Sequence, residues 1–517
     1  MNRGALSGLS LVPHSAGSYE FSPPRKKDKM TEAAGAGQGI TGRAVRRVAA
    51  NTLSLAIADI ANKLLMFLFY MVAARHLGVE KFGVLSFALA FVTMLAIFTD
   101  LGLGAVAARE IARDPGVARQ YVTNAVGIKL VAALIVIGMI VFLVNVLRYP
   151  AATIRVVYIC SLFVFESAFV AYGGYVFQGF QRMEFTALTR LLQTGVLVGG
   201  ALLLARGAAM AERYAWLYAG AGLLAALFVA LVIATKFVRL GVSFDLSQWK
   251  GQLRAALSIG IANVFVVFYY WNGTALLSKL AGERAVGEFN AAFRLAMGLT
   301  FAAIAFSGAL YPVMSKLFIE EKERLSQTVE QAIKLIMVIL LPIGVLGTTL
   351  ADPIMRLLYG TEFVSSTPVF RILVWWTFCA GFNSLLSNLS MAVNRSRNMT
   401  IQTALALAIN LVLNGLLISK LGALGAAISI VAAEGVSVIF YLTLLRRVAG
   451  PVHFGRLAGL VGRAVIAVTP AAVCALLAVR IHVVVGITAG FVAYALALVA
   501  TGAVGQSELM TLKAVLT

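Results

Sequence analysis

Residues 74–113, ARHLGVEKFGVLSFALAFVTMLAIFTDLGLGAVAAREIAR, combine a turn and a membrane-spanning segment. A short basic turn that includes Gly78 closes one apolar run, and a second apolar run begins at Phe82. Asp100 ends the second run, and the LGLG that follows can bend a helix because glycine has no Cβ to hold it helical. The stretch therefore predicts two membrane helices joined by a tight turn.

The composition of the chain indicates a polytopic membrane protein. Of its 517 residues, 60% are hydrophobic and 13% are charged, whereas a soluble domain is about half apolar and about a quarter charged. The net charge is +21, but the Lys and Arg residues stand singly between apolar runs. They do not form the basic patch with stacking aromatics that nucleic-acid binding requires, so nucleic acid is excluded as a partner.

Fourteen apolar runs long enough to cross a membrane follow a basic N-terminal tail. We expect an all-α polytopic fold with a disordered cytoplasmic tail at 1–45, a six-helix lobe at 46–240, a second six-helix lobe at 241–447 and two extra helices at 448–517. The runs lie at 51–74, 82–107, 121–146, 154–178, 187–205, 214–236, 253–279, 288–315, 328–350, 368–392, 398–419, 422–445, 458–479 and 482–504.

The Lys and Arg residues predict the orientation of the chain. If the tail is cytoplasmic, the connections that follow even-numbered spans are cytoplasmic too, and these connections carry more Lys and Arg than those on the other side. Cytoplasmic loops are enriched in these residues. Both ends are therefore predicted to be cytoplasmic, with the protein in the inner (cytoplasmic) membrane.

The turn of the opening stretch recurs in the second half of the chain. Residues 77–88, LGVEKFGVLSFA, align without a gap with residues 281–292, AGERAVGEFNAA, at an offset of 204 residues. Because each half has six runs, both copies enter the membrane from the same side. This pattern predicts two lobes related by a pseudo-two-fold axis along the membrane normal, with chance similarity between glycine-containing turns as the alternative.

Three elements of the opening stretch follow the order found in a known family. Residues 75–83 match an R-x-LG-x-x-x-FG turn, residues 100–103 a D-x-GL element, and residues 109–113 an R-x-x-A-R element. The stretch resembles the oligosaccharide flippases, the polysaccharide-exporting branch of a superfamily that also holds multidrug antiporters. The resemblance implies two lobes around a polar cavity, a polyprenyl-diphosphate-linked oligosaccharide as substrate, and no cofactor.

The resemblance continues to about residue 445 and includes one departure. Gly287, Phe289 and Arg294 resemble the family's opening of span 8. Many relatives carry an acidic residue near the middle of span 7, but residues 270–274, YWNGT, include none. This departure argues against cation or proton coupling through that position.

Charged and polar residues inside the predicted spans are the candidate site residues, because an intramembrane charge costs about 2.5–3.5 kcal/mol on insertion scales and needs a partner or water. Asp59 and Lys63 are one helical turn apart on one face, so they form either a structural ion pair or part of a substrate site. Arg294 either lines the cavity or extends to the membrane surface. The predicted substrate-binding residues are Lys63, Arg294, Asp59, Arg75, Asn272 and Glu166.

Polar residues of the second half allow two interpretations. The asparagine amides of this half either join helices or bind sugar hydroxyls, and joining is the simpler interpretation. These asparagines are Asn263, Asn272, Asn383, Asn388, Asn410 and Asn414. Glu434 is expected to be a solvated helix cap near the end of its span.

These features predict a flippase that works by alternating access. The glycan and diphosphate would cross in the cavity while the polyprenyl tail stays in lipid, so no covalent bond changes and the protein is not an enzyme. Expected partners are the lipid-linked oligosaccharide, membrane lipids, a polysaccharide polymerase and glycosyltransferases. The alternatives are a multidrug or cation antiporter of the same superfamily, for which Asp59, Asp100 and Glu166 are the relevant acids, and a membrane enzyme, against which the short predicted loops argue.

Overall fold

The computed structural model describes residues 42–239, 241–395, 397–448 and 454–502, and these residues form helices without a strand. The first half contains α2 (Gly42–Ala96), η1 (Ile97–Thr99), α3 (Leu103–Arg113), η2 (Pro115–Val117), α4 (Ala118–Val146), α5 (Ala151–Ser161), α6 (Phe163–Gly179), α7 (Glu184–Leu204) and α8 (Ala211–Lys236). The second half contains α9 (Leu246–Leu280), α10 (Gly282–Leu299), α11 (Phe301–Glu320), α12 (Lys322–Thr349), α13 (Ala351–Tyr359), η3 (Thr361–Ser366), α14 (Thr367–Ala392), α15 (Arg397–Leu421), α16 (Ala423–Val448), α17 (Phe454–Ala478) and α18 (Val483–Ala500).

Twelve segments of the described residues are long and apolar enough to cross a membrane. The predicted all-α polytopic fold is therefore confirmed, whereas the number fourteen stays a prediction. Two segments account for the difference: Ala58–Thr99 contains two predicted spans, and Gly462–Ala478 is shorter than a full span. The predicted tail at 1–45 lies almost entirely outside the described residues.

Large hydrophobic side chains cover much of the exposed surface of these helices. An apolar side chain that faces water would raise the free energy of the folded chain, whereas one that faces lipid does not. The exposed surface is therefore suited to lipid contact. Examples whose exposed fraction exceeds three fifths are Leu64, Phe142, Leu231 and Leu496.

Two glycines with left-handed backbone break the helices at equivalent points of the repeat. Gly78 divides α2 with φ of 72°, and Gly282 separates α9 from α10 with φ of 84°. Glycine adopts a positive φ without the steric cost that a Cβ imposes. The two turns, 204 residues apart, therefore share a positive φ at the equivalent glycine.

The two turns also lie against each other in a reciprocal way. A Cβ built on Gly83 would overlap the backbone carbonyl of Glu283, and a Cβ built on Gly287 would overlap the carbonyl of Val79. Each of these contacts is the other shifted by 204 residues, so the repeat relates them. Small residues allow such a close approach of two backbones. Both turns thus lie on one side of the helices, which we call the turn side.

A further break separates η1 from α3. Leu101 and Gly102 adopt positive φ values of 40° and 88° at this point. The fully buried side chain of Lys129 in α4 donates to Asp100 at 2.7 Å and to the carbonyl of Thr99 at 3.3 Å. A buried ammonium needs such partners, so this ion pair fixes the position of the break.

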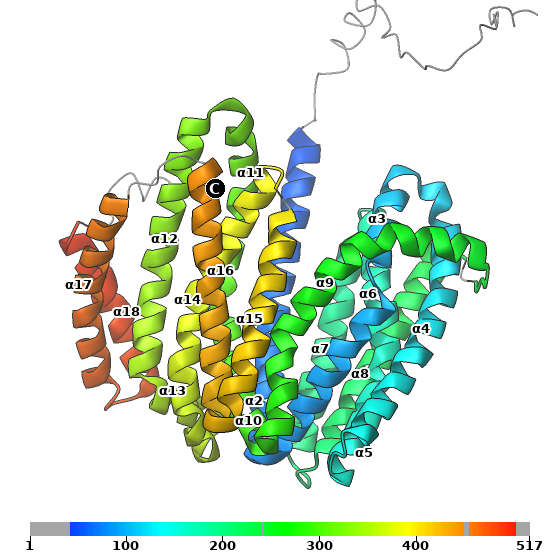
Figure 1. Ribbon diagram of the computed structural model, residues 1–517, viewed down its shortest axis with the longest axis horizontal. Helices are drawn as coiled ribbons and strands as arrows, with labels where there is room; N and C mark the ends of the chain where they lie inside the picture. Colours follow the sequence, from blue (N-terminus) through cyan, green and yellow to red (C-terminus); the bar gives the residue numbers. More distant parts are fainter. Residues whose placement is uncertain (1–41, 240, 396, 449–453, 503–517) are drawn as a thin grey trace, which may run out of the picture. The chain divides into compact units, whose positions relative to one another are not determined.

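Helix packing divides most of the described helices into two groups that α9 joins. In the first group, α6 packs against α3, α4 and α8, and α7 packs against α8. In the second group, α14 packs against α10, α11, α12 and α16. Helix α9 contacts both α3 and α15, and Figure 1 shows it running diagonally between them. Because α9 belongs to both groups, the predicted boundary between residues 240 and 241 stays a prediction.

Helix α9 begins at a well-formed cap outside the membrane spans. The Asp245 carboxylate accepts hydrogen bonds from the backbone N–H groups of Ser247 at 3.0 Å and Gln248 at 3.4 Å. The hydrogen bond from the Ser247 hydroxyl lowers the pKa of Asp245. The carboxylate form, which is the better cap, is therefore favoured.

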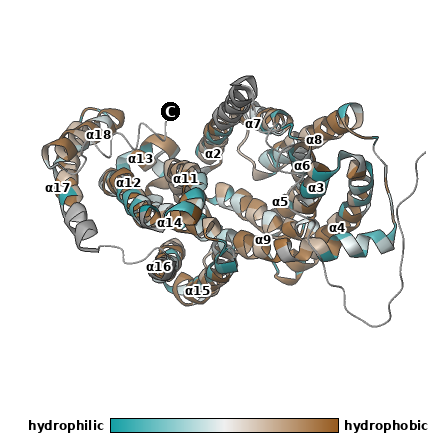
Figure 2. Ribbon diagram, turned by 90° about the horizontal axis from the view of Figure 1, so that it is seen from above, coloured by the Kyte–Doolittle hydropathy of each residue, from teal (hydrophilic) through white to brown (hydrophobic). Residues whose placement is uncertain are grey.

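The last two helices form a pair against the second group. Figure 2 shows α17 and α18 beside α12, and the hydroxyl of Tyr494 in α18 donates to the carbonyl of Val338 in α12 at 3.0 Å. Ala467 and Ala471 of α17 are buried in the same contact. The described parts of the two extra helices thus dock mainly onto α12, and α18 also contacts α13.

Candidate functional site

Asp59, Lys63 and Arg190 form a charged cluster between α2 and α7. Lys63 Nζ lies 3.0 Å from Asp59 Oδ2, as the spacing of four residues predicts. Arg190 Nη1 lies 3.3 Å from the second carboxylate oxygen, Asp59 Oδ1. The side chain of Lys63 is 50% exposed and that of Arg190 is 56% exposed. The cluster therefore ties two helices together and still presents two cations to a ligand.

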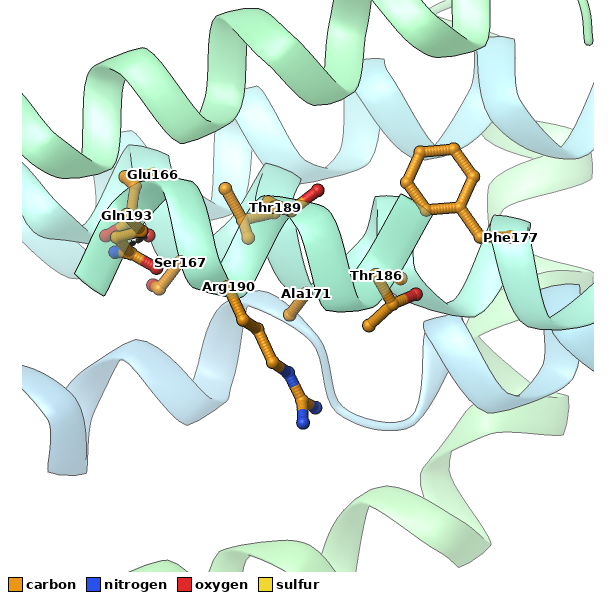
Figure 3. A pocket seen from close by; sticks show the side chains of 10 residues that line it. Glu166, Ser167, Ala171, Phe177, Thr186, Thr189, Arg190 and Gln193 are labelled. Carbon is orange, nitrogen blue, oxygen red and sulfur yellow. Dashed lines mark hydrogen bonds between the residues drawn. The ribbon is translucent and has the colours of Figure 1, made fainter. Parts of the chain in front are cut away.

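A cavity of about 290 Å³ lies between α6 and α7 and includes Arg190 in its wall. Figure 3 shows Glu166 and Gln193 toward one end of the cavity and Phe177 and Thr186 toward the other. Its volume is near the lower limit of about 300 Å³ for small-molecule pockets. Since Arg190 contacts Asp59 as well, the cavity adjoins the charged cluster.

Glu166 is the buried acid of this cavity, with 6% of its surface exposed. Gln193 donates Nε2 to Glu166 Oε1 at 2.8 Å, while Oε2 is buried and has no hydrogen-bond partner among the described residues. Gly222 of α8 makes room for the carboxyl group, because a Cβ there would overlap it. The sequence contains no clear signal for this arrangement, since a lone glycine does not reveal which helix faces it.

Arg294 of α10 stacks on an aromatic ring from the first half of the chain. The guanidinium carbon lies 3.4 Å from the ring centroid of Tyr70 in α2 and 5.9 Å from that of Trp271 in α9. Its Nε is buried and has no acceptor among the described residues. Arg294 is twelve residues from the start of α10, or about 18 Å at a rise of ~1.5 Å per residue. The cation therefore lies deep along the helix.

Lys63, in the first half of the chain, lies over an aromatic ring from the second half. Its Nζ lies 4.1 Å from the ring centroid of Phe301, at the start of α11 in the second half. Lys63 and Tyr70 are seven residues apart, which places them on the same face of α2 about two turns, or ~10 Å, from each other. The two cations predicted to bind substrate, Lys63 and Arg294, thus lie along one face of α2.

Arg75 joins the two halves through backbone carbonyls. Its Nε donates to the carbonyl of Leu358 at 2.8 Å, and its Nη2 donates to the carbonyl of Leu357. Lys279, the equivalent residue 204 positions later, donates to the carbonyl of Leu147 at 2.7 Å. We call these two contacts the cation latch. Their geometry supports a structural role for Arg75, and its substrate-binding role stays a prediction.

Asn272 is part of an amide network between α9 and α15. Its Nδ2 donates to the carbonyls of Phe268 at 2.8 Å and Tyr269 at 3.0 Å. Its Oδ1 accepts from Asn414 Nδ2 at 2.8 Å, and Asn414 also donates to Asn410 at 3.0 Å. Asn272 is 3% exposed. This geometry supports helix joining, and a contact between Asn272 and a sugar stays a prediction.

The expectation that Glu434 is a solvated cap is wrong. Glu434 lies in the interior of α16 and is 6% exposed, and the hydroxyl of Tyr269 in α9 donates to its carboxylate. Asn383 donates to the backbone carbonyl of Glu434 at 3.1 Å. The tyrosine hydroxyl from another helix supplies the donor that lets the carboxyl group leave water. An acidic group thus lies beside the α9 stretch 270–274, which has none of its own.

Comparison with known proteins identifies two matching families. Residues 48–318 match the family described as polysaccharide biosynthesis protein, and residues 258–416 match the family described as MatE. The probable low-salt glycan biosynthesis flippase Agl15 of Haloferax volcanii is 24% identical over 76% of this chain and 82% of its own length. A putative O-antigen transporter of Escherichia coli is 24% identical over 51% of this chain and 64% of its own length.

Solved structures of the same fold include a flippase and a drug transporter. The lipid II flippase MurJ in an inward closed conformation superposes with a TM-score of 0.69 at 12% identity, covering 86% of this chain and 98% of that chain. An inward-facing multidrug resistance MATE family transporter superposes with a TM-score of 0.59 at 18% identity, covering 75% of this chain and 94% of that chain. At these identities the likeness concerns the two-lobe fold alone.

Proposed function

The chain belongs to the polysaccharide biosynthesis protein family, and we propose that it is a flippase that moves a lipid-linked oligosaccharide across the membrane. It is a transporter, since its action changes no covalent bond of the substrate. The lipid is a polyprenyl diphosphate, the membrane is the inner membrane, and both ends of the chain are cytoplasmic. A polymerase and glycosyltransferases that act on the same glycan are the partners that this function requires.

The placement of Lys63 and Arg294 along one face of α2 carries this proposal. A diphosphate that enters a low-dielectric cavity loses hydration, and cationic donors must replace the lost water. Arginine can grip phosphate through two parallel N–H donors, whereas lysine acts as a point charge. Asp59 holds Lys63 in place while the site is empty.

The cavity beside Arg190 suits the glycan part of the substrate. Its wall offers a carboxylate, an amide and hydroxyl groups from Glu166, Gln193, Thr186 and Thr189. Sugar hydroxyls can donate to and accept from such groups. The two lobes would expose the site alternately to the two sides of the membrane, while the polyprenyl tail stays in lipid.

Ligand-dependent thermal unfolding of the purified full-length chain tests the proposal. A prenyl-diphosphate-linked sugar should raise the unfolding temperature. A ligand that binds only the native state, at a free concentration of about 100 times its Kd, stabilises that state by about 2.7 kcal/mol. The same prenyl chain as an uncharged alcohol should give a much smaller shift. Equal shifts from the two lipids would contradict the proposed anion site.

A multidrug or cation antiporter is the second candidate, and the MatE match at residues 258–416 favours it. The acids Asp59, Asp100 and Glu166 would then carry the coupling cation or proton. Efflux of a cationic dye from vesicles that contain the chain separates the two functions. Dye efflux driven by a sodium or proton gradient, without movement of the glycan lipid, would support the antiporter.

A further inference from the structure

Two aromatic rings lie beneath the two cations of the proposed anion site, and each ring comes from the half of the chain opposite to its cation. Arg294 of α10 lies 3.4 Å from the ring centroid of Tyr70 in α2. Lys63 of α2 lies 4.1 Å from the ring centroid of Phe301 in α11. Both anion-binding cations are thus held by contacts that cross between the halves.

The contact with Tyr70 uses only part of the binding capacity of Arg294. A stacked guanidinium presents its face to the ring and keeps its N–H donors at the edge. The Nε donor of Arg294 is buried and has no acceptor among the described residues, and an unfilled charged donor is stabilised by an incoming anion. The ring fixes the plane of the guanidinium and excludes water from one face, so less freedom is lost when the anion binds.

The contact also depends on how the two halves meet. Tyr70 lies eight residues before Gly78, and Arg294 lies twelve residues after Gly282, so each is carried by a helix that ends at one of the two touching turns. The turns pack against each other through Gly83 and Gly287. If the halves part on the turn side, the helices that carry the ring and the guanidinium separate with the turns.

We infer that Tyr70 is a positioning residue that holds Arg294 ready for the diphosphate, so that the anion site is complete only while the two turns are in contact. This inference rests on the proposed function and adds a release mechanism to it. Opening on the turn side takes the ring from beneath Arg294, restores the freedom of the guanidinium and lowers the affinity for the anion. The substrate is then released on that side of the membrane.

Binding of a short prenyl diphosphate to the full-length chain in nanodiscs tests the role of Tyr70. The probes are farnesyl diphosphate and the uncharged alcohol farnesol. Holding one long side chain ready for a ligand raises the affinity roughly two- to tenfold, because less side-chain freedom is lost on binding. Tyr70→Leu should therefore lower the affinity for farnesyl diphosphate by about this factor and leave the affinity for farnesol unchanged. Tyr70→Phe, which keeps the ring, should bind both probes as the native chain does.

Tyr172→Leu is the matched control. Tyr172 is also a buried tyrosine beneath a cation, with Lys129 Nζ 5.2 Å from its ring centroid, but both residues belong to the first half. This variant should lose stability without changing the ratio of the two affinities. Phe301→Leu should weaken the binding of farnesyl diphosphate to a smaller extent. The lysine ammonium is a point charge and has no planar group that a ring could hold in one orientation.

The outcomes separate failure of this inference from failure of the proposed function. If Tyr70→Leu lowers the affinity for both probes equally, or for neither, Tyr70 has only a packing role. The inference is then wrong, while the proposed anion site stands. If the native chain itself binds farnesyl diphosphate no more tightly than farnesol, the proposed anion site is wrong and the inference falls with it.

Discussion

At the scale of single residues, Arg294 is the group on which transport is expected to depend most. Arg294→Ala should abolish movement of the glycan lipid with protein levels intact, because it removes the guanidinium that stacks on Tyr70. Arg294→Lys should restore transport only in part, since an ammonium lacks the two parallel donors. Both variants are assayed for glycan export and for membrane-protein abundance. Full export by Arg294→Ala would remove the anion site from the account.

Lys63 and Asp59 allow a second test at this scale. The double variant Asp59→Asn with Lys63→Gln, called here the neutral pair, keeps both side chains similar in size. It removes the lysine charge that would attract a diphosphate. Export should fall strongly although the fold should persist, because exposed ion pairs contribute only about 0–1 kcal/mol. If the neutral pair exports at the native rate, the ion pair is structural and Lys63 does not touch the substrate.

The single variant Lys63→Ala should not leave the Asp59 carboxylate unpaired. Without Lys63, the Asp59 carboxylate still has Arg190 Nη1 at 3.3 Å.

The spacing of four residues in one helix predicts the Asp59–Lys63 pair from the sequence alone. The partner from α7 could not be predicted, because no local pattern states which residues of two distant helices meet. For the same reason, the sequence does not predict that Glu434 is buried beside Tyr269.

At the scale of helices and turns, the cation latch is expected to hold the turn side closed. Arg75→Ala combined with Lys279→Ala removes both cations from the carbonyls that they bind. A cysteine at the fully buried position Val286, in a chain that lacks Cys379 and Cys474, reports opening. Its labelling by a membrane-impermeant maleimide should rise at least about fivefold, since a loss of roughly 1 kcal/mol changes an equilibrium by that factor.

Charge removed elsewhere serves as the control for the latch. Arg206→Ala with Lys420→Ala takes two exposed cations from the connections predicted to lie on the same side of the membrane. This variant should leave the labelling rate of the cysteine unchanged. Equal increases in both variants would mean that net charge, and not the latch, controls the opening.

The turns were the most predictable elements, and the reason is physical. Gly78 and Gly282 need a positive φ, and Gly83 and Gly287 allow two backbones to touch. Glycine favours the first geometry and its missing Cβ permits the second, so the sequence repeat carries both visibly. The length of α9 and its contacts with both groups of helices were less visible. Apolar runs define where a helix crosses the membrane but not which neighbours it contacts.

At the scale of the whole molecule, the distribution of Lys and Arg predicts the topology. Reporter fusions at Arg182 and Arg395 should report the cytoplasm, and fusions at Arg148 and Lys420 should report the opposite side. Such fusions also test the number of spans, because an added or missing helix inverts every later connection. Arg182 and Arg395 on opposite sides of the membrane would be incompatible with two six-helix lobes in parallel orientation.

Reconstituted transport measures whether this chain moves a lipid-linked oligosaccharide across a membrane. Vesicles containing the full-length chain are loaded with a prenyl-diphosphate-linked oligosaccharide, and an impermeant glycosidase outside measures the fraction of glycan that has become accessible. We expect this fraction to rise well above one half, or to rise far faster than in protein-free vesicles, and Arg294→Ala to abolish the increase. If the glycan in vesicles with the native chain is no more accessible than in protein-free vesicles, the chain is not a flippase for this lipid.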